Sequence, residues 1–183
     1  MVLHLSDVKK KLPFKVSTGL SMESVERFVE NHYRYTFDFD VYLPSKDKNL
    51  QRPLIWTRPQ KQEFILSILK GITIPPLSII QYRSKPGTSN SVTLKFIDGK
   101  QRFTTATAFY KNEFPIMVCG IDFWFKDLDT ECKNLIAFFG FTFNVAYEYD
   151  YDMISDEDKI AWFEQINFFG TPQDKTHLKD LKG

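Results

Sequence analysis

A stretch near the middle of the chain brings an acid, a glycine and two cations together: Asp98-Gly99-Lys100-Gln101-Arg102. It follows an apolar, β-prone run at residues 92–97 and opens a pattern that predicts a helix. A strand, a tight glycine turn and a helix N-terminus present free backbone N–H groups and a positive dipole end to an anion. Lys100 and Arg102 add positive charge there, and the Asp98 carboxylate suits Mg²⁺ or the activation of water. The alternative is an Asp-Gly turn that caps a helix beside two surface cations.

Further polar side chains lie where they can reach the same site. Thr104 and Thr105 fall in the first turn of the expected helix, where hydroxyls bind a phosphate, a metal-bound water or, more commonly, the helix backbone. Arg52 follows Gln51 just before an earlier helical pattern and can reach into a site from a rigid turn. The alternative for Arg52 is a surface arginine stacked on Trp56.

The hydrophobic patterns around these residues predict helices and strands in irregular alternation, which indicates an α+β protein. The expected helices are a short one capped by Ser21, one after a Thr57–Gln60 capping box that ends at Gly71, one at 100–110, one at 130–139 capped by Asp129 and closed by Gly140, and one capped by Ser155. The expected strands lie at 33–41, 77–82, 92–97, near 113–118 and at 141–149. Loops are expected at 44–49 and 86–90, and the acidic segment 150–158 is expected to be solvated.

Composition suits a single domain over residues 1–183, with a basic lead-in at 1–20 and a core at about 33–175. Hydrophobic residues make up 43% of the chain, and most of its 18 phenylalanines are expected in the core. Two cysteines and three scattered histidines make no metal framework. No signal peptide or run of membrane-spanning length is evident, so we expect a cytoplasmic protein with no membrane partner.

The net charge of +1 is unevenly distributed along the chain. Residues 1–121 carry 18 cations and 10 anions (+8), residues 122–158 carry 2 and 10 (−8), and residues 159–183 carry 4 and 3 (+1). The expected anion site lies in the basic part, which suits a nucleotide or nucleic acid. The excess is too modest for a purely electrostatic nucleic-acid coat.

Three blocks of the sequence, in this order, resemble one protein family. They are Gln51-Arg52…Trp56 with residues 64–71 and Ile74-Pro75-Pro76-Leu77, then Ile97-Asp98-Gly99-Lys100-Gln101-Arg102-Phe103-Thr104-Thr105, then Phe163-Glu164-Gln165-Ile166-Asn167 with Gly170-Thr171-Pro172. They are similar to blocks of the N-terminal domain of GmrSD-type modification-dependent restriction enzymes, which has a ParB/sulfiredoxin-like fold. The resemblance runs from about residue 33 to the end.

This resemblance implies a nucleotide-binding, phosphate-handling domain used in bacterial defence against phage. Family members are linked to NTP hydrolysis and in some cases to DNA nicking, so NTP and Mg²⁺ are the expected cofactors. The resemblance maps a site onto the catalytic candidates Asp98 and Arg102, the metal candidate Asp98, and the nucleotide- or phosphate-binding candidates Gln51, Arg52, Gly99, Lys100, Gln101, Thr104, Thr105 and Asn167.

The chain departs from the family pattern in three respects. Lys100 stands where the family has a glutamine, and His177 stands where a glutamate commonly follows the last block. Many relatives continue into a helical region and an HNH nuclease domain, and we find no such motif here, which indicates either a short stand-alone version or a truncated chain. The glycine turn lacks the reactive cysteine of sulfiredoxin, and no helix-turn-helix resembling that of ParB is evident.

Three functions follow as hypotheses. The first is a Mg²⁺-dependent NTP hydrolase or DNA nickase, with Arg52 closing the site from the other side. The second is a nucleotide- or DNA-binding switch or inhibitor of a related defence system, without turnover and with either a host or a phage origin. The third is a protein-docking scaffold. The expected partners are a nucleotide, DNA, and an HNH-nuclease partner or a second copy of the chain.

Overall fold

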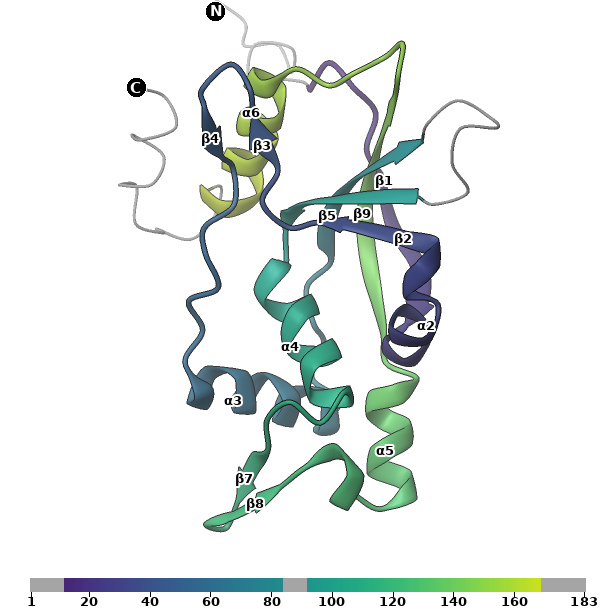
Figure 1. Ribbon diagram of the computed structural model, residues 1–183, viewed down its shortest axis with the longest axis vertical. Coiled ribbons are helices and arrows are strands. Elements are labelled where there is room, and N and C mark those ends of the chain that lie inside the picture. The colour runs from purple at the N-terminus through teal and green to yellow at the C-terminus, as the bar shows by residue number, and fades with distance from the viewer. Residues whose placement is uncertain (1–11, 84–91, 169–183) are drawn as a thin grey trace, which may run out of the picture.

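The computed structural model describes residues 12–83 and 92–168, and Figure 1 shows how their helices and strands are arranged. The helices are α2 (Val25–Glu30), α3 (Arg58–Leu69), α4 (Lys100–Tyr110), α5 (Thr130–Ala137) and α6 (Asp156–Phe168), with the 3-10 turns η1 (His32–Arg34) and η2 (Phe125–Asp127). The strands are β1 (Ser17–Ser24), β2 (Tyr35–Asp38), β3 (Tyr42–Leu43), β4 (Lys48–Asn49), β5 (Leu77–Arg83), β6 (Val92–Asp98), β7 (Ile116–Val118), β8 (Ile121–Phe123) and β9 (Gly140–Tyr149). Within these described stretches, no helix is both long enough and apolar enough to cross a membrane.

Five of the strands form one mixed sheet in the order β1-β9-β5-β6-β2. β1 pairs antiparallel with β9 and β5 antiparallel with β6, whereas β5 with β9 and β2 with β6 are parallel pairs. Two short hairpins, β3–β4 and β7–β8, lie outside this sheet. The expected α+β class, a mixed sheet flanked by helices, is confirmed.

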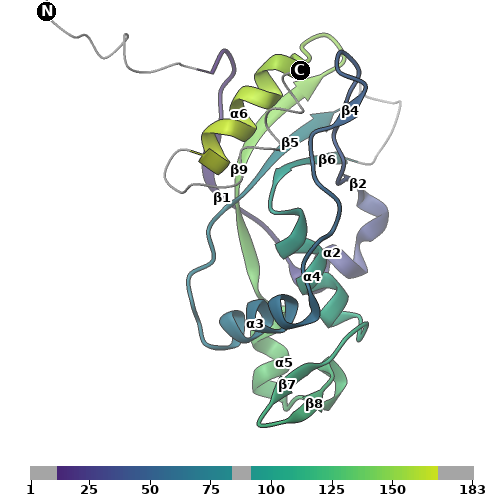
Figure 2. The same cartoon turned by 90° about the vertical axis from the view of Figure 1, so that its left-hand side faces the viewer.

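Each face of the sheet has its own hydrophobic cluster. Helices α2 to α5 pack on one face, while α6 and the β3–β4 hairpin pack on the other (Figure 2). The larger cluster is rich in phenylalanine: the ring centroid of Phe103 on α4 lies 5.0 Å from that of Phe96 on β6 and 5.2 Å from that of Phe28 on α2. For these buried rings, the expected core role is confirmed.

Side chains at the helix starts explain why several helices begin where they do. Each one accepts a hydrogen bond from a backbone N–H that has no partner inside the helix. The contacts are Arg27 N to Ser24 Oγ (3.3 Å) at α2, Thr57 N to Gln60 Oε1 (2.9 Å) at α3, Cys132 N to Asp129 Oδ1 (2.8 Å) at α5 and Asp158 N to Ser155 Oγ (3.2 Å) at α6. The caps expected at Thr57, Asp129 and Ser155 are confirmed.

Other boundaries differ from the sequence-based expectations. Ser21 does not cap a helix: it lies inside β1, and Ser24 caps α2 instead. Residues 17–20, expected in a lead-in, are also strand because they pair with β9. Gly140 begins β9 rather than closing the preceding helix, and residues 44–49 lie in the β3–β4 hairpin rather than in a plain loop. At Ser21, residues 17–20 and Gly140 a strand partner distant in sequence decides the local structure, whereas the β3–β4 hairpin pairs locally.

Two further expectations need correction. The expected strand at 33–41 is shorter, since β2 covers Tyr35–Asp38 after the 3-10 turn. The acidic segment 150–158 is not uniformly solvated, because Asp156 Oδ2 accepts a hydrogen bond from Ser45 N at 2.9 Å and Asp156 Oδ1 lies 3.7 Å from Lys159 Nζ. The expectations for the loop at 86–90, for Gly170-Thr171-Pro172 and for His177 lie outside the described residues.

Candidate functional site

The turn between β6 and α4 has a conformation that requires glycine. Gly99 precedes α4 with a φ of 98°, in the left-handed region. A Cβ at this position would lie only 2.3 Å from Leu77 Cδ2, so a side chain would also clash with β5. Phe103 N donates to Gly99 O at 3.0 Å, which closes the first turn of the helix. The backbone N–H groups before Phe103 therefore have no acceptor within the helix, and the first turn contains no acidic residue.

A cavity of about 630 Å³ lies against this turn. Its walls come from the segment before α3, the connector before β5, the β6–α4 turn, β9 and α6, which are well separated in sequence. Its lining residues are Gln51, Arg52, Ile55, Trp56, Pro75, Pro76, Ser78, Asp98, Gly99, Lys100, Gln101, Arg102, Asn144, Phe163, Ile166 and Asn167. The volume falls within the range of small-molecule sites.

Eight of the ten predicted site residues therefore meet at one cavity, and two do not. The eight are Gln51, Arg52, Asp98, Gly99, Lys100, Gln101, Arg102 and Asn167. Thr104 and Thr105 are absent from the lining. Thr104 Oγ1 donates to the Lys100 carbonyl oxygen at 2.7 Å, the backbone use expected as the alternative. Thr105 is buried, and its hydroxyl has no hydrogen-bond partner within the described part of the chain.

A row of three polar side chains crosses the middle of the sheet at the cavity. Ser78 on β5 pairs with Asp98 on β6 and with Asn144 on β9. Ser78 is fully buried, and Asn144 Nδ2 donates to its Oγ at 3.4 Å. Sequence reasoning missed Ser78 and Asn144. The available signal was a serine inside the otherwise apolar run of β5, but its polar neighbours depend on strand register.

Asp98 and Arg102 form an ion pair one helical turn apart. Arg102 Nη2 lies 2.5 Å from Asp98 Oδ2, and Arg102 Nη1 donates to the carbonyl oxygen of Pro75. The Asp98 side chain keeps 26% of its surface exposed and the Arg102 side chain 16%, so both remain accessible from the cavity. A guanidinium has five N–H donors, and these two bonds leave others for a ligand.

Lys100 is placed differently from the sequence-based expectation. Its side chain is only 8% exposed, and its Nζ lies 2.8 Å from Oδ1 of Asp40, whose side chain is 61% exposed. The Asp40 carboxylate neutralises much of the charge that Lys100 would add to the cavity. Lys100 still belongs to the lining, so its role as a phosphate ligand stays a prediction.

Two glutamines hold in place the segment before α3, which forms one wall of the cavity. Gln51 Nε2 donates to the Ile97 carbonyl oxygen, in the strand that delivers Asp98. Gln101 Nε2 donates to the Pro53 carbonyl oxygen at 3.0 Å, and Gln101 Oε1 accepts from Trp56 N at 3.2 Å. Both ends of the Gln101 amide thus bind the backbone of the wall. This arrangement places the indole of Trp56 and the exposed Arg52 at the cavity.

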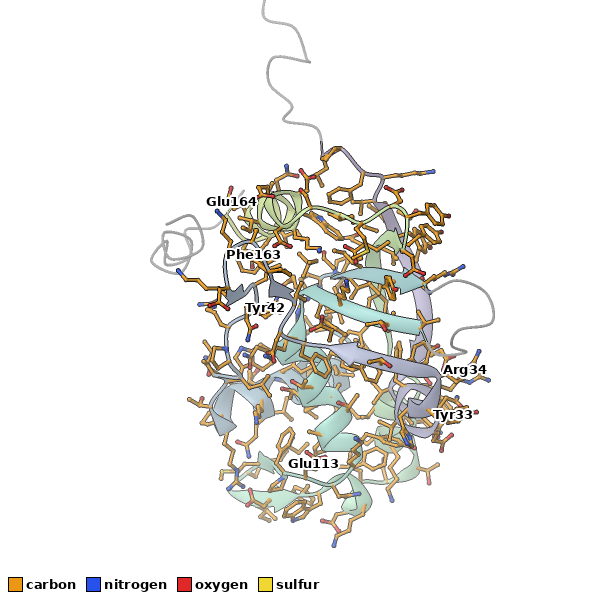
Figure 3. All side chains as sticks on the ribbon, turned by 45° about the horizontal axis from the view of Figure 1, so that its top comes forward. Tyr33, Arg34, Tyr42, Glu113, Phe163 and Glu164 are labelled. Carbon is orange, nitrogen blue, oxygen red and sulfur yellow. The ribbon has the colours of Figure 1, made fainter. Side chains whose placement is uncertain are left out.

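Helix α6 supplies the opposite wall. Phe163, Ile166 and Asn167 line the cavity, and Asn167 Nδ2 donates to the Phe163 carbonyl oxygen at 2.9 Å. Figure 3 shows Phe163 on α6 at the same end of the molecule as Tyr42 on the β3–β4 hairpin. The cavity is thus lined by polar groups at the α4 N-terminus and by four apolar side chains, those of Ile55, Trp56, Phe163 and Ile166.

A second hollow, on the exposed face of α5, has the same volume of about 630 Å³. Its lining residues are Thr130, Glu131, Asn134, Leu135, Phe138 and Phe139. This described lining has one carboxylate and no cation, so its chemistry does not suit a phosphate. The cavity at the β6–α4 turn is the better anion site.

Asp98 fits Mg²⁺ as a single protein ligand. Mg²⁺ in phosphate-handling sites is often held by one or two carboxylates together with substrate phosphates and water. Asp98 is the only carboxylate in the described lining of the cavity. Over residues 12–83 and 92–168, no group of three or more His, Cys, Asp or Glu side chains lies close enough to hold a metal ion without a substrate.

Comparison with known proteins assigns the chain to a family. No curated protein and no solved structure matches the chain. The family model of the GmrSD restriction endonuclease N-terminal domain matches residues 39–180, a range that includes every cavity-lining residue. The chain therefore belongs to the GmrSD restriction endonuclease N-terminal domain family and is a domain of the restriction-system class.

Proposed function

We propose that the domain binds a nucleoside triphosphate in the cavity at the β6–α4 turn. The proposal rests on one observation: the N-terminus of α4, Arg52 and Arg102 line the same cavity. Free backbone N–H groups and a helix dipole favour phosphate oxygens, and arginine matches their geometry with paired donors. The apolar part of the lining, which includes Trp56 and Phe163, suits a base and sugar.

Each residue has a defined part in this binding. Gly99 gives the backbone the left-handed turn that precedes α4, Arg102 presents its remaining donors to the phosphates, and Arg52 approaches from the segment before α3. Gln51 and Gln101 hold that segment through the backbone, and the Asp98 carboxylate would hold Mg²⁺ together with the phosphates. The ion would neutralise phosphate charge and act as a Lewis acid.

Binding predicts stabilisation of the folded protein. A ligand at 100 times its Kd adds about 2.7 kcal/mol to the free energy of unfolding. A thermal-shift screen of ATP, GTP, CTP and UTP with Mg²⁺ should therefore raise the Tm with at least one nucleotide. Arg52→Ala should weaken binding by roughly 10- to 100-fold, because a hydrogen bond to a charged group contributes about 1.5–3 kcal/mol. Arg102→Ala should weaken binding at least as much.

Arg58→Ala is the matched control, since Arg58 on α3 pairs with Asp122 at 2.6 Å and does not line the cavity. It should leave the nucleotide-induced shift unchanged. An unchanged Tm of the wild type with all four nucleotides, together with no binding of DNA at low salt, would exclude the proposed function. Binding of DNA alone would assign the phosphate site to a phosphodiester backbone instead.

Phosphoryl-ester hydrolysis is a second candidate function, favoured by the position of Asp98 beside the helix N-terminus. In that function, Asp98 would hold the metal ion or position water, and Arg102 would stabilise the charge that grows on the transferred phosphate. Asp98→Asn should then lower Mg²⁺-dependent phosphate release and plasmid nicking by a much larger factor than it weakens nucleotide binding. Wild-type protein that binds a nucleotide without either activity would be a binding switch.

The remaining expectations concern partners. Two expected partners stay predictions: an HNH nuclease and a second copy of the chain. A scaffold role, which needs no chemistry at Asp98, also stays a prediction. A partner complex that survives both Asp98→Ala and Arg102→Ala would favour the scaffold.

A further inference from the structure

A fully buried carboxylate lies under α6. Glu148 on β9 has no exposed surface, and its two oxygens bind different lysines. Glu148 Oε2 lies 2.6 Å from Lys95 Nζ on β6, and Glu148 Oε1 lies 3.1 Å from Lys159 Nζ on α6. Glu148 Oε1 also accepts a hydrogen bond from Ile154 N at 3.2 Å. Removing a buried charge from water is costly unless it is paired, so these contacts constrain the elements that make them.

The same cluster reaches the β3–β4 hairpin. Asp156 at the start of α6 lies 3.7 Å from Lys159 and accepts a hydrogen bond from Ser45 N in the hairpin. We call Lys95, Glu148, Asp156 and Lys159 the anchor cluster. It joins the sheet, α6 and the hairpin, and each of these leads into a wall of the cavity. β6 ends at Asp98, the hairpin is followed by Gln51, and α6 carries Phe163.

Helix geometry connects the anchor cluster with the cavity wall. Lys159, Phe163 and Ile166 are spaced i, i+4, i+7 and so lie on one face of α6. Asn167 follows eight residues after Lys159, which at 1.5 Å per residue is about 12 Å along the helix axis. A shift of the helix at Lys159 therefore moves the side chains that line the cavity.

Apolar packing alone specifies the position of α6 less precisely than the ion pair with Glu148 does. Ile160, Trp162 and Phe163 are buried in the smaller cluster, but hydrophobic burial is non-directional. A buried carboxylate, by contrast, penalises every placement of α6 that leaves it without its second lysine.

We propose that Lys159 is a positioning residue for the phosphate site. Its ion pair with Glu148 holds α6 in the register that places Phe163, Ile166 and Asn167 at the cavity. This inference rests on the proposed function, because the cavity must bind a nucleotide for the wall to affect affinity. Lys159 is absent from the described cavity lining and acts through the helix.

Two lysines that share one carboxylate provide a matched experiment. Lys159→Met and Lys95→Met each leave Glu148 with one lysine, but only Lys159 belongs to α6. We expect both variants to lower the Tm. Lys159→Met should also raise the Kd of a fluorescent nucleoside triphosphate by about tenfold, and Lys95→Met should change it by less than about twofold. Lys159→Arg keeps the cation and should restore most of the affinity.

Amide hydrogen exchange of α6 gives a readout that does not need the ligand. Exchange at residues 160–167 should rise in Lys159→Met and remain near the wild-type level in Lys95→Met. Equal changes of Kd or of exchange in the two variants would overturn the positioning role and leave a general contribution to stability. If wild-type protein binds no nucleotide, the proposed function fails separately, and the exchange comparison alone decides whether Lys159 positions α6.

Discussion

At the scale of single residues, the site depends on side chains whose partners are distant in sequence. Lys100 pairs with Asp40 rather than facing an anion alone, and Arg102 divides its donors between Asp98 and Pro75. Gln101 binds two backbone groups of the segment before α3. Residue type therefore indicated the chemistry available at the turn, whereas these contacts decide which groups are free to meet a ligand.

Substitution of Gly99 tests how tightly the turn is packed. Gly99→Ala combines a positive φ with a Cβ 2.3 Å from Leu77 Cδ2, so either the turn or the leucine must move. Left-handed backbone strain alone costs about 1–2 kcal/mol, and we expect a larger loss here. Thermal unfolding should show a lower Tm, with weaker nucleotide binding.

Gly71→Ala is the matched control, because Gly71 also has a positive φ of 68° but its Cβ would meet nothing within 4 Å. It should show the backbone cost alone. Equal losses of stability in the two variants would mean that contact with Leu77 is not a constraint.

At the scale of elements, side-chain caps and strand partners together decide where helices begin. The sequence pattern predicts Ser21 as the N-cap of the first helix, whereas in the structure the cap is Ser24. Pairing of residues 17–24 with β9 extends the strand through Ser21, so the helix can begin only after Ser24. Strand pairing, rather than the local pattern, therefore decides which serine caps the helix.

Replacement of each serine tests this selection. Ser24→Ala removes the acceptor of the Arg27 N–H and should lower the free energy of unfolding by about 1 kcal/mol. If strand pairing places the cap at Ser24, Ser21→Ala should lower the free energy of unfolding by less than Ser24→Ala does. Urea denaturation of both variants measures the difference. A larger loss for Ser21→Ala would place the cap at the earlier serine.

At the scale of the whole molecule, one sheet separates two hydrophobic clusters. Phe96 and Ile97 are consecutive in β6 and fully buried, but Phe96 belongs to the cluster under α2–α5 and Ile97 to the cluster under α6. The backbone of the sheet therefore lies between the two clusters, and Figure 2 shows the helices on either side of the sheet. The cavity lies where β6 meets α4 and α6, so its walls depend on both clusters.

Large-to-small substitutions on the two faces test whether the clusters unfold together. Phe96→Ala should cost about 3–5 kcal/mol and Ile97→Ala about 2–5 kcal/mol. Because both side chains belong to one strand, each variant should unfold in a single transition by both fluorescence and circular dichroism. An Ile97→Ala protein that loses α6 in a separate early transition would show that the two faces are independent units.

Much of the fold could be predicted from local patterns. The helix starts at Thr57, Asp129 and Ser155 follow from capping chemistry that operates within one turn. The strand–turn–helix around Gly99 follows from an apolar run that ends at an Asp-Gly pair. Boundaries set by distant pairing, as at Ser21 and Gly140, could not be predicted, because the partner strand is separated by more than a hundred residues.

The sequence by itself determined the strand–turn–helix around Gly99, the chemistry of the Asp98–Arg102 turn and the candidate Arg52, since these depend on neighbours a few residues apart. Resemblance to a family added Gln51 and Asn167 to the candidate site. Only the tertiary structure decided that these residues share a cavity with Ser78 and Asn144, and that Thr104 and Thr105 do not. Strand register and helix packing set those distances, and both depend on contacts between segments far apart in the chain.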